Sequence, residues 1–287
     1  MERAGKKAVV IMVALLGASA TWAADNHKQV KLNVAANGVV NVVNPFGSVT
    51  VKPGAARQVV VNYTTTSDKI EVDSNGTPDG RRIEIRTHAV SPQKPTPEES
   101  RVDYELVVPA GISINITTAA APITVDDLNG DITLSSDTGQ ITVRGVNNAF
   151  IHVHSLTAPV VLNNLTGIHA EIMSSGGAVQ LANVTGPKIK ASTTSGNISY
   201  EGDCSGGGAY SLITHSGVIN VTLPEAASVD LSAQSVSGTV QNDFPLTARQ
   251  HNSFVPSPGR SFAGTSHSGS SSMELQSFSG RIRVKKQ

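Results

Sequence analysis

A small residue recurs along the second half of the chain at nearly constant intervals, and this repeat restricts the possible folds more than any other feature. The intervals between successive members are 18, 19, 19, 19, 21, 21 and 42 residues. Repeats of this length predict units that cannot bury their apolar groups alone and must stack on one another. The small residues, called anchors below, are Ala121, Gly139, Ala158, Gly177, Gly196, Gly217, Gly238 and Gly280.

Apolar residues stand at fixed distances on either side of each anchor. Around Gly139 they are Ile132 and Leu134 before the anchor, and Ile141 and Val143 after it. Such alternation places the apolar residues on one face of a strand. We therefore predict an all-β, single-domain β-solenoid, similar to a parallel β-helix, with coils of about 18–21 residues. The last interval, twice 21, predicts a degenerate coil between the last two anchors and thus nine coils from residue 112 onward.

The residue three positions before each anchor is always a hydroxyl. By parity it faces inward, where a hydroxyl needs a hydrogen-bond partner, and the neighbouring backbone or the hydroxyl of the next coil can supply one. A catalytic serine array is the alternative, but a nucleophile is needed once rather than in every coil. The hydroxyl residues are Thr118, Ser136, Ser155, Ser174, Thr193, Thr214, Ser235 and Ser277.

The chain divides into an N-terminal β region and cap (24–111) and the repetitive solenoid (112–287), which has a loop excursion at 243–270. Gly47 fits as the anchor of an early coil. The Pro- and Glu-rich segment 91–100 predicts a surface loop. Because loops on a rigid scaffold usually carry function, we expect it in these two loops. Strands are predicted at 30–34, 39–43, 48–51, 58–65, 70–72, 82–86 and 102–108.

The first residues predict a cleaved secretory signal peptide, residues 1–23. Arg3, Lys6 and Lys7 precede an apolar run, and small residues allow cleavage after Ala23 or, as second choice, after Ala20. An uncleaved anchor is the alternative, but the apolar run falls short of the roughly 20 residues that span a bilayer. We expect an exported protein, periplasmic or at the cell surface, with no membrane span.

The charge and cysteine content narrow the possible partners. The net charge is zero, so there is no basic field that would attract nucleic acid. The basic last strand, residues 281–286, is expected to protect an exposed sheet edge, with a nucleic-acid patch as the alternative. Cys204 is the only cysteine and cannot form an internal disulfide. We expect it to be a small buried filler; a reactive thiol is the alternative.

Four aspartates form the only acid cluster among the coils. A glycoside hydrolase needs two carboxylates about 5–9.5 Å apart, but these residues flank a turn, Leu128 to Gly130, where solvated acids are common. We therefore assign them to turn structure and predict no catalytic residues and no cofactor. The aspartates are Asp126, Asp127, Asp131 and Asp137.

The histidines do not form a recognisable metal site. His152 and His154 share an outward strand face without a nearby third ligand, and His251 and His267 fall in the C-terminal excursion. We predict no metal.

The repeat register also predicts one surface column. Thr133, His152, Glu171 and Lys190 should face outward in adjacent coils about 5 Å apart. The simple interpretation is a solvated charge ladder, and the alternative is a pH-sensitive stripe.

The residues Val107–Ile114, the repeated Ser-x-Ser-Gly-x-Ile-x-Val coils and Ser279–Val284 resemble the bacterial putative-adhesin family of unknown function. The resemblance implies an exported β-solenoid related to the head domains of autotransporter-like adhesins, with no established catalytic residues. We predict a non-enzymatic, adhesin-like binding or structural protein of the cell envelope, whose partner is a polysaccharide or a protein and whose binding residues are unknown. The alternative is a carbohydrate-active β-helix enzyme, either a polysaccharide lyase or a glycoside hydrolase.

Overall fold

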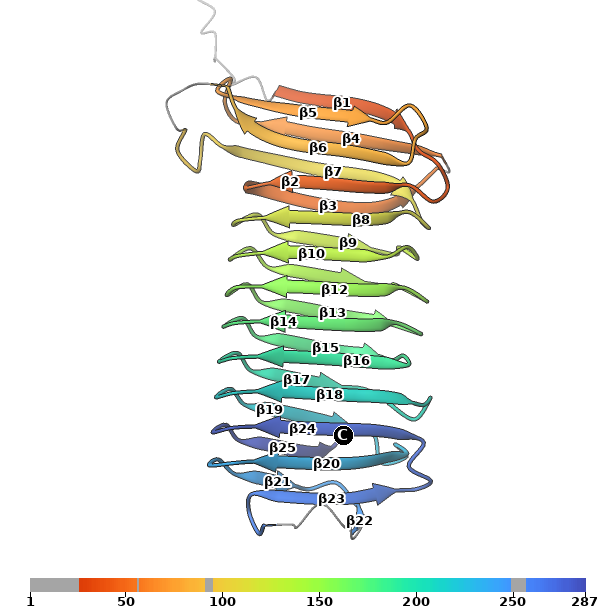
Figure 1. Ribbon diagram of the computed structural model, residues 1–287, viewed down its shortest axis with the longest axis vertical. Helices are drawn as coiled ribbons and strands as arrows, with labels where there is room; N and C mark the ends of the chain where they lie inside the picture. The colour runs from red at the N-terminus through yellow and green to blue at the C-terminus, as the bar shows by residue number, and fades with distance from the viewer. Residues whose placement is uncertain (1–25, 56, 91–94, 249–256) are drawn as a thin grey trace, which may run out of the picture.

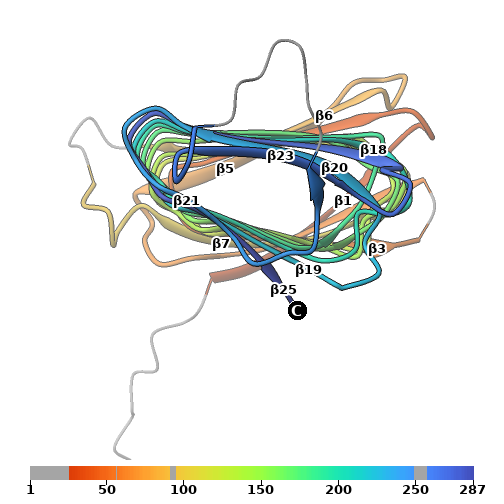
Figure 2. The same cartoon turned by 90° about the horizontal axis from the view of Figure 1, so that it is seen from below.

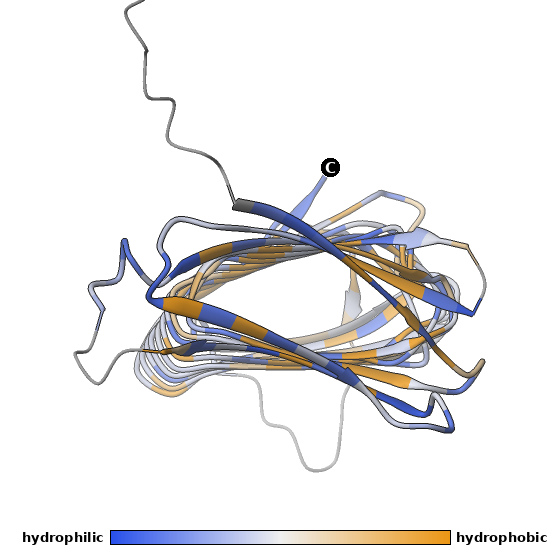
Figure 3. Cartoon of the chain, turned by 90° about the horizontal axis from the view of Figure 1, so that it is seen from above, coloured by the Kyte–Doolittle hydropathy of each residue, from blue (hydrophilic) through white to orange (hydrophobic). Residues whose placement is uncertain are grey.

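Two long β-sheets face each other along the whole length of the protein (Figure 1). The computed structural model describes residues 26–55, 57–90, 95–248 and 257–287. Seen along its axis, the stack of coils encloses a flattened oval (Figure 2). Hydrophobic and hydrophilic residues alternate along the strands, as the period of a β-strand requires (Figure 3). The predicted all-β solenoid is confirmed.

Sheet A has 12 strands. From the N-terminal end of the stack they are β1 (Asn26–Asn33), β4 (Gln58–Thr65), β7 (Arg101–Pro109), β3 (Phe46–Gly54), β9 (Ile123–Asp126), β11 (Ile141–Arg144), β13 (Val160–Leu165), β15 (Val179–Val184), β17 (Ile198–Glu201), β19 (Ile219–Leu223), β25 (Ile282–Lys286) and β21 (Val240–Asn242).

Sheet B has 13 strands. In the same direction they are β5 (Ile70–Gly76), β6 (Arg82–Ala89), β2 (Val39–Asn44), β8 (Ser113–Thr118), β10 (Ile132–Ser136), β12 (Phe150–Ser155), β14 (His169–Ser174), β16 (Lys188–Thr193), β18 (Gly208–Thr214), β24 (Ser271–Ser277), β20 (Val229–Ser235), β23 (Ser261–Ser266) and β22 (Thr247–Ala248). The seven strands predicted before residue 109 are all present as β1 to β7, most of them longer than expected.

Equivalent residues of successive coils lie side by side, because the coils pair in parallel and in register. Ile141 pairs with Ile123 on one side and with Val160 on the other. All three side chains are fully buried. Because of this register, the apolar positions around each anchor form the continuous core predicted from the repeat. Burying each such side chain contributes roughly 1.5–3 kcal/mol to stability.

The order of coils in the stack differs from their order in the chain. The last coil, β24–β25, lies between β18–β19 and β20–β21 (Figure 1). The degenerate coil predicted between Gly238 and Gly280 was wrong, because that interval holds the antiparallel strands β22 and β23. Among the residues that the structure describes, eight coils, not nine, follow residue 112. At the other end the coil predicted around Gly47 is confirmed, since Val49 of β3 pairs with Ile123.

Antiparallel strands close both ends of the stack. β4 pairs with β7, β5 with β6, and β23 with β20. The predicted edge-protecting role of the last strand was wrong, because β25 is paired on both sides. Its Arg283 instead lies 3.4 Å from the Asp243 carboxylate. At the end of the stack opposite β1 and β5, the outermost strands β21 and β22 are very short, and short edge strands offer little to a pairing partner.

Each turn that carries an anchor connects a strand of sheet B to the following strand of sheet A, and we call this side of the solenoid the anchor edge. The hydroxyls before the anchors are buried there, as predicted. Most bond to their own coil: Ser155 donates to the Ala158 carbonyl at 2.7 Å, and Thr193 to the Gly196 carbonyl at 2.6 Å. The neighbouring-coil partners that we expected occur less often, as between the Thr193 and Thr214 hydroxyls at 3.0 Å.

The close approach of coils explains why the anchors are small. A Cβ atom added to Gly177 would collide with the Ala158 carbonyl oxygen and lie 2.7 Å from its carbon. One added to Gly280 would meet the Gly217 carbonyl in the same way. The residue at the anchor therefore sets how closely the turns stack.

The opposite side, which we call the far edge, has a second repeated device that the sequence analysis missed. Asp127, Asn164 and Asn183 adopt positive φ angles of 55°, 55° and 53°. Asparagine, aspartate and glycine tolerate this conformation best. All three stand six residues after their anchors, and that fixed spacing of Asp and Asn was the signal available in the sequence. The Asn183 amide donates to the Asn164 side-chain oxygen of the next coil at 3.1 Å.

Candidate binding site

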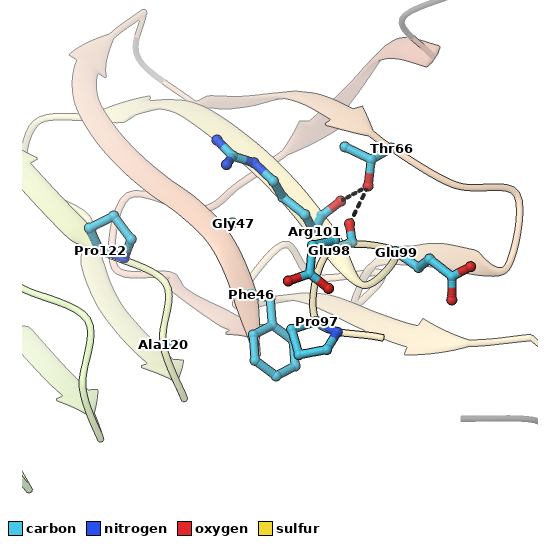
Figure 4. Close-up of a pocket in the computed structure, with 9 residues that line it drawn as sticks. All are labelled: Phe46, Gly47, Thr66, Pro97, Glu98, Glu99, Arg101, Ala120 and Pro122. Carbon is cyan, nitrogen blue, oxygen red and sulfur yellow. Dashed lines mark hydrogen bonds between the residues drawn. The ribbon is translucent and has the colours of Figure 1, made fainter. Parts of the chain in front are cut away.

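An open cavity of about 770 Å³ lies on the anchor edge near the N-terminal end of the stack. It forms where residues 97–101, which lead into β7, lie beside the turns of the coils β2–β3 and β8–β9 (Figure 4). The described part of the predicted functional loop 91–100 therefore contributes to this site. The cavity is lined by Phe46, Gly47, Thr66, Pro97, Glu98, Glu99, Arg101, Ala120 and Pro122.

Phe46 supplies the aromatic surface of the cavity. It occupies the position just before an anchor, where later coils carry small residues such as Thr138 and Ser195. In Figure 4 its ring and the ring of Pro97 lie on one side of the cavity, and Pro122 lies on the other. The cavity thus has apolar walls with polar groups at its rim, the usual composition of a small-molecule site.

Hydrogen bonds hold the segment that forms the rim. The Thr66 hydroxyl donates to the Glu98 carbonyl at 2.8 Å and reaches the Arg101 carbonyl at 3.4 Å. Within the segment, the Ser100 hydroxyl donates to the Thr96 carbonyl at 2.8 Å. These contacts tie the backbone of the rim to the end of β4.

Most charges at the rim are already paired. The Arg101 guanidinium donates to the Asp103 carboxylate at 2.9 Å, and this hydrogen bond raises the pKa of Arg101. Lys69 donates to Glu99 at 2.7 Å, which lowers the pKa of that carboxyl. Glu98 makes no ion pair with any residue that the structure describes. The rim therefore offers one free carboxylate as an acceptor, with little net field.

The four aspartates that the sequence grouped together do not form one cluster. Asp126, Asp127 and Asp131 lie on the far edge, whereas Asp137 lies on the anchor edge. The five-residue strand β10 separates the two groups, which is roughly 17 Å. Asp127 has the positive φ of a tight turn, as the turn interpretation predicted. Asp126 lies 3.7 Å from the Arg144 guanidinium.

The predicted surface column is confirmed. Thr133, His152, Glu171 and Lys190 pair successively across β10, β12, β14 and β16. Lys190 donates to Glu171 at 3.1 Å, and His152 lies 4.0 Å from the same carboxylate. The Lys190 hydrogen bond is the main cause that lowers the pKa of Glu171.

The remaining candidate residues have structural surroundings. His267 contacts the Ser266 hydroxyl at 3.0 Å and the Ala227 carbonyl at 3.3 Å, and His251 falls outside the described residues. Across the described chain, no three His, Cys, Asp or Glu side chains are grouped to hold a metal ion. Cys204 is fully buried, and burial raises the pKa of its thiol to about 11. The prediction of a buried filler is confirmed.

Comparison with known proteins identifies the family. The model of the family described as Toastrack DUF4097 matches residues 46–285. The chain belongs to this family. No curated protein matches the sequence.

Three bacterial proteins of solved structure show a distant similarity to this chain. A putative adhesin from Bacteroides fragilis NCTC 9343 is 12% identical, with a TM-score of 0.45, over 91% of this chain and 97% of that one. A putative lipid binding protein from Parabacteroides distasonis ATCC 8503 is 11% identical, with a TM-score of 0.41 and the same coverage. A putative cell adhesion protein from Clostridium sporogenes ATCC 15579 is 10% identical, with a TM-score of 0.29, over 91% and 100%. With TM-scores below 0.5, these similarities carry no argument about fold, function or ligands.

The predicted signal peptide, residues 1–23, and both of its cleavage sites lie outside the described residues. In the part of the chain that is described, no helix is long and apolar enough to cross a membrane.

Proposed function

We propose that this protein is an exported, non-enzymatic component of the cell envelope that binds a polysaccharide in the cavity around Phe46. The observation that carries the proposal is the composition of that cavity, in which an aromatic ring and two prolines stand beside paired charges and one free carboxylate. The basic and apolar start of the chain, followed by Ala20 and Ala23, supports export.

Sugar rings suit such a cavity because they have both apolar and polar surfaces. Their C–H faces pack on aromatic rings, and their hydroxyl groups need fixed hydrogen-bond partners. Phe46 supplies the first kind of surface. The Glu98 carboxylate and the exposed Thr66 supply the second. The paired state of Arg101 and Glu99 disfavours a ligand of high charge.

A glycan array, followed by calorimetry with the polymers that bind, tests the proposal. Replacing Phe46 by Ala is expected to weaken binding about tenfold, as loss of a central aromatic contact does. Phe150→Ala is the matched control, because Phe150 is 63% exposed and lies far from the cavity. Equal loss in both variants, or no glycan binding by the parent protein, refutes the proposal.

The same polymers also test the alternative of a carbohydrate-active enzyme. The protein is expected to bind them without releasing new reducing ends or unsaturated products. Turnover that disappears in the Asp126→Ala/Asp127→Ala variant would establish an enzyme and overturn the non-enzymatic assignment.

A further inference from the structure

Exposed apolar side chains gather on one line of the solenoid surface. Among the described residues, seven large hydrophobic side chains are exposed. Five of them stand either two or four positions before an anchor, and partly buried Ile213 also stands at the second of these positions. We call these residues the apolar strip: Val43, Leu156, Met173, Ile213, Phe278 and Val236.

Register aligns the strip along the axis. Met173 pairs with His154 and Ser192 of the coils on either side, and Ile213 pairs with Ser192 and Gln276. The columns continue past the strand ends, where the Leu156 amide donates to the Ser136 carbonyl at 3.2 Å. The strip thus spans nine coils on the sheet-B side of the anchor edge, roughly 38 Å, with no member in the coils β8–β9, β10–β11 and β16–β17.

The insertion of the last coil places Phe278 in the strip. Its ring stacks on His215 with centroids 4.8 Å apart and an interplanar angle of 5°. Beside this pair lies a groove of about 350 Å³, lined among others by Ile213, Gln276 and Val236. The groove lies between the two columns of the strip, so the strip is hollowed rather than flat at this end.

Charge is scarce along these two columns. At the two positions in the nine coils, Asp137 is the only carboxylate and there is no lysine or arginine. The apolar side chains alternate with serine, threonine and glutamine, as at Ser175, Thr194 and Gln276. This surface does not match an anionic lipid headgroup or a nucleic acid, each of which needs cationic groups.

The strip is also too narrow for a stable dimer. Its two columns lie about 7 Å apart, which with a length of roughly 38 Å gives on the order of 270 Å². A stable protein interface buries about 800 Å² on each partner. A long and thin ligand fits these dimensions better than a second copy of the chain.

We propose that the apolar strip binds an uncharged, linear polysaccharide lengthwise, parallel to the solenoid axis. The proposal rests on the glycan-binding function of the Phe46 cavity, which lies on the same edge. The apolar side chains contact the C–H faces of successive sugar rings. The hydroxyl and amide side chains between them bond to the sugar hydroxyls.

The test compares ligand length. Binding of cello-, laminari- and chito-oligosaccharides, from the disaccharide to the octasaccharide, is measured by calorimetry. The parent protein is expected to bind the octasaccharide of its preferred series at least about tenfold more tightly than the disaccharide, because only the longer chain reaches the strip. The strip variant is Leu156→Ser/Met173→Ser, in which both altered side chains are exposed and leave the core intact. Phe150→Ser is its control.

The expected result is that the strip variant loses the gain with length but keeps disaccharide binding, whereas Phe46→Ala weakens both. If affinity still rises with oligosaccharide length in the strip variant, the strip proposal is overturned and the cavity proposal stands. If octasaccharide binding depends on the strip but is unchanged by Phe46→Ala, the strip proposal is supported and the cavity proposal is refuted. Strip-dependent binding to phosphatidylcholine vesicles, without any oligosaccharide binding, refutes both.

Discussion

The stacking of anchors leads to a sharp prediction for Gly177. In the Gly177→Ala variant the new Cβ would lie 2.7 Å from the Ala158 carbonyl carbon and 3.0 Å from the Ser174 hydroxyl oxygen. Both atoms are held in place. Ala158 belongs to the preceding coil, which is packed against this one, and the Ser174 hydroxyl accepts a hydrogen bond from the Gly177 amide at 2.9 Å. The two coils must therefore move apart locally.

The cost follows from this overlap. Overpacking a tight contact destabilises a protein by typically 1–3 kcal/mol, and we expect about 2 kcal/mol here because the clash is with backbone. For a chain of this size, that corresponds to a fall in melting temperature of roughly 4–8 °C. The assay is thermal unfolding followed by the β-strand signal in circular dichroism.

Gly206→Ala is the control. A Cβ atom added at Gly206 meets no heavy atom within 4 Å. Its free energy of unfolding is expected to match that of the parent protein within about 0.5 kcal/mol. Ala121 and Ala158 occupy the anchor position in other coils, so alanine itself is not forbidden there. A Gly177→Ala variant as stable as the control would show that coil spacing is not set by this contact.

Three further predictions concern the core and the surface. Ile141→Asp places an unpaired charge in a fully buried position and should prevent folding, seen as loss of soluble protein and of the β-strand signal. Lys190→Ala should cost about 0.3 kcal/mol at pH 7. Because the folded-state pKa of Glu171 is lowered, this contribution is present above its unfolded pKa of about 4.3 and vanishes as pH falls through the lower folded value. Urea unfolding at pH 7 and at low pH measures the loss of stability in the variant. An equal loss at low pH contradicts the assignment of this stability to the Lys190–Glu171 pair. Cys204 should react with a thiol reagent at pH 8 only after unfolding, and fast reaction of the native protein would contradict its burial.

The register could be predicted from sequence because stacked coils of equal length leave little freedom. Once the anchors align, every other position of the coil aligns too, which is why Glu171 lies between His152 and Lys190. The buried hydroxyls followed from the same parity. Their main partners did not, because a hydroxyl three residues before a turn reaches its own coil more easily than the next one.

The order of the coils could not be predicted because the coils are nearly interchangeable. The coil of Gly280 fits on the coil of Gly217, and so would the coil of Gly238, since all three share the hydroxyl and most of the apolar positions, although the Gly238 coil has Asn242 where the other two have Val221 and Val284. Asn242, exposed at a position where the other two coils bury valine, was a local signal that the Gly238 coil lies at the end of the stack. The choice depends on β22 and β23, which pair antiparallel at the end of the stack, and these strands do not follow the repeat.

The candidate site escaped prediction for a related reason. It depends on long-range contacts, such as that between Thr66 and the Glu98 carbonyl, which are 32 residues apart. One signal was available, since Phe46 replaces the small residue that usually precedes an anchor. The apolar strip left a similar trace, as Leu156, Met173 and Phe278 stand at outward positions where a solvated β-strand normally carries polar residues.

The inserted last coil also explains how the stack avoids leaving long strand edges open to pairing with another chain. If the coils stacked in the order of the chain, β24 and β25 would be the outermost strands, with seven and five residues open to a pairing partner. Placing them inside the stack pairs both strands on both sides. The outermost strands are then β22 and β21, with two and three residues. At the other end the exposed Lys28 of β1 stands opposite the buried Tyr63, and a charge on an edge strand also discourages pairing there. The departures from the repeat thus shorten the open edge of the stack at one end and place a charge on it at the other, and both oppose the addition of further copies.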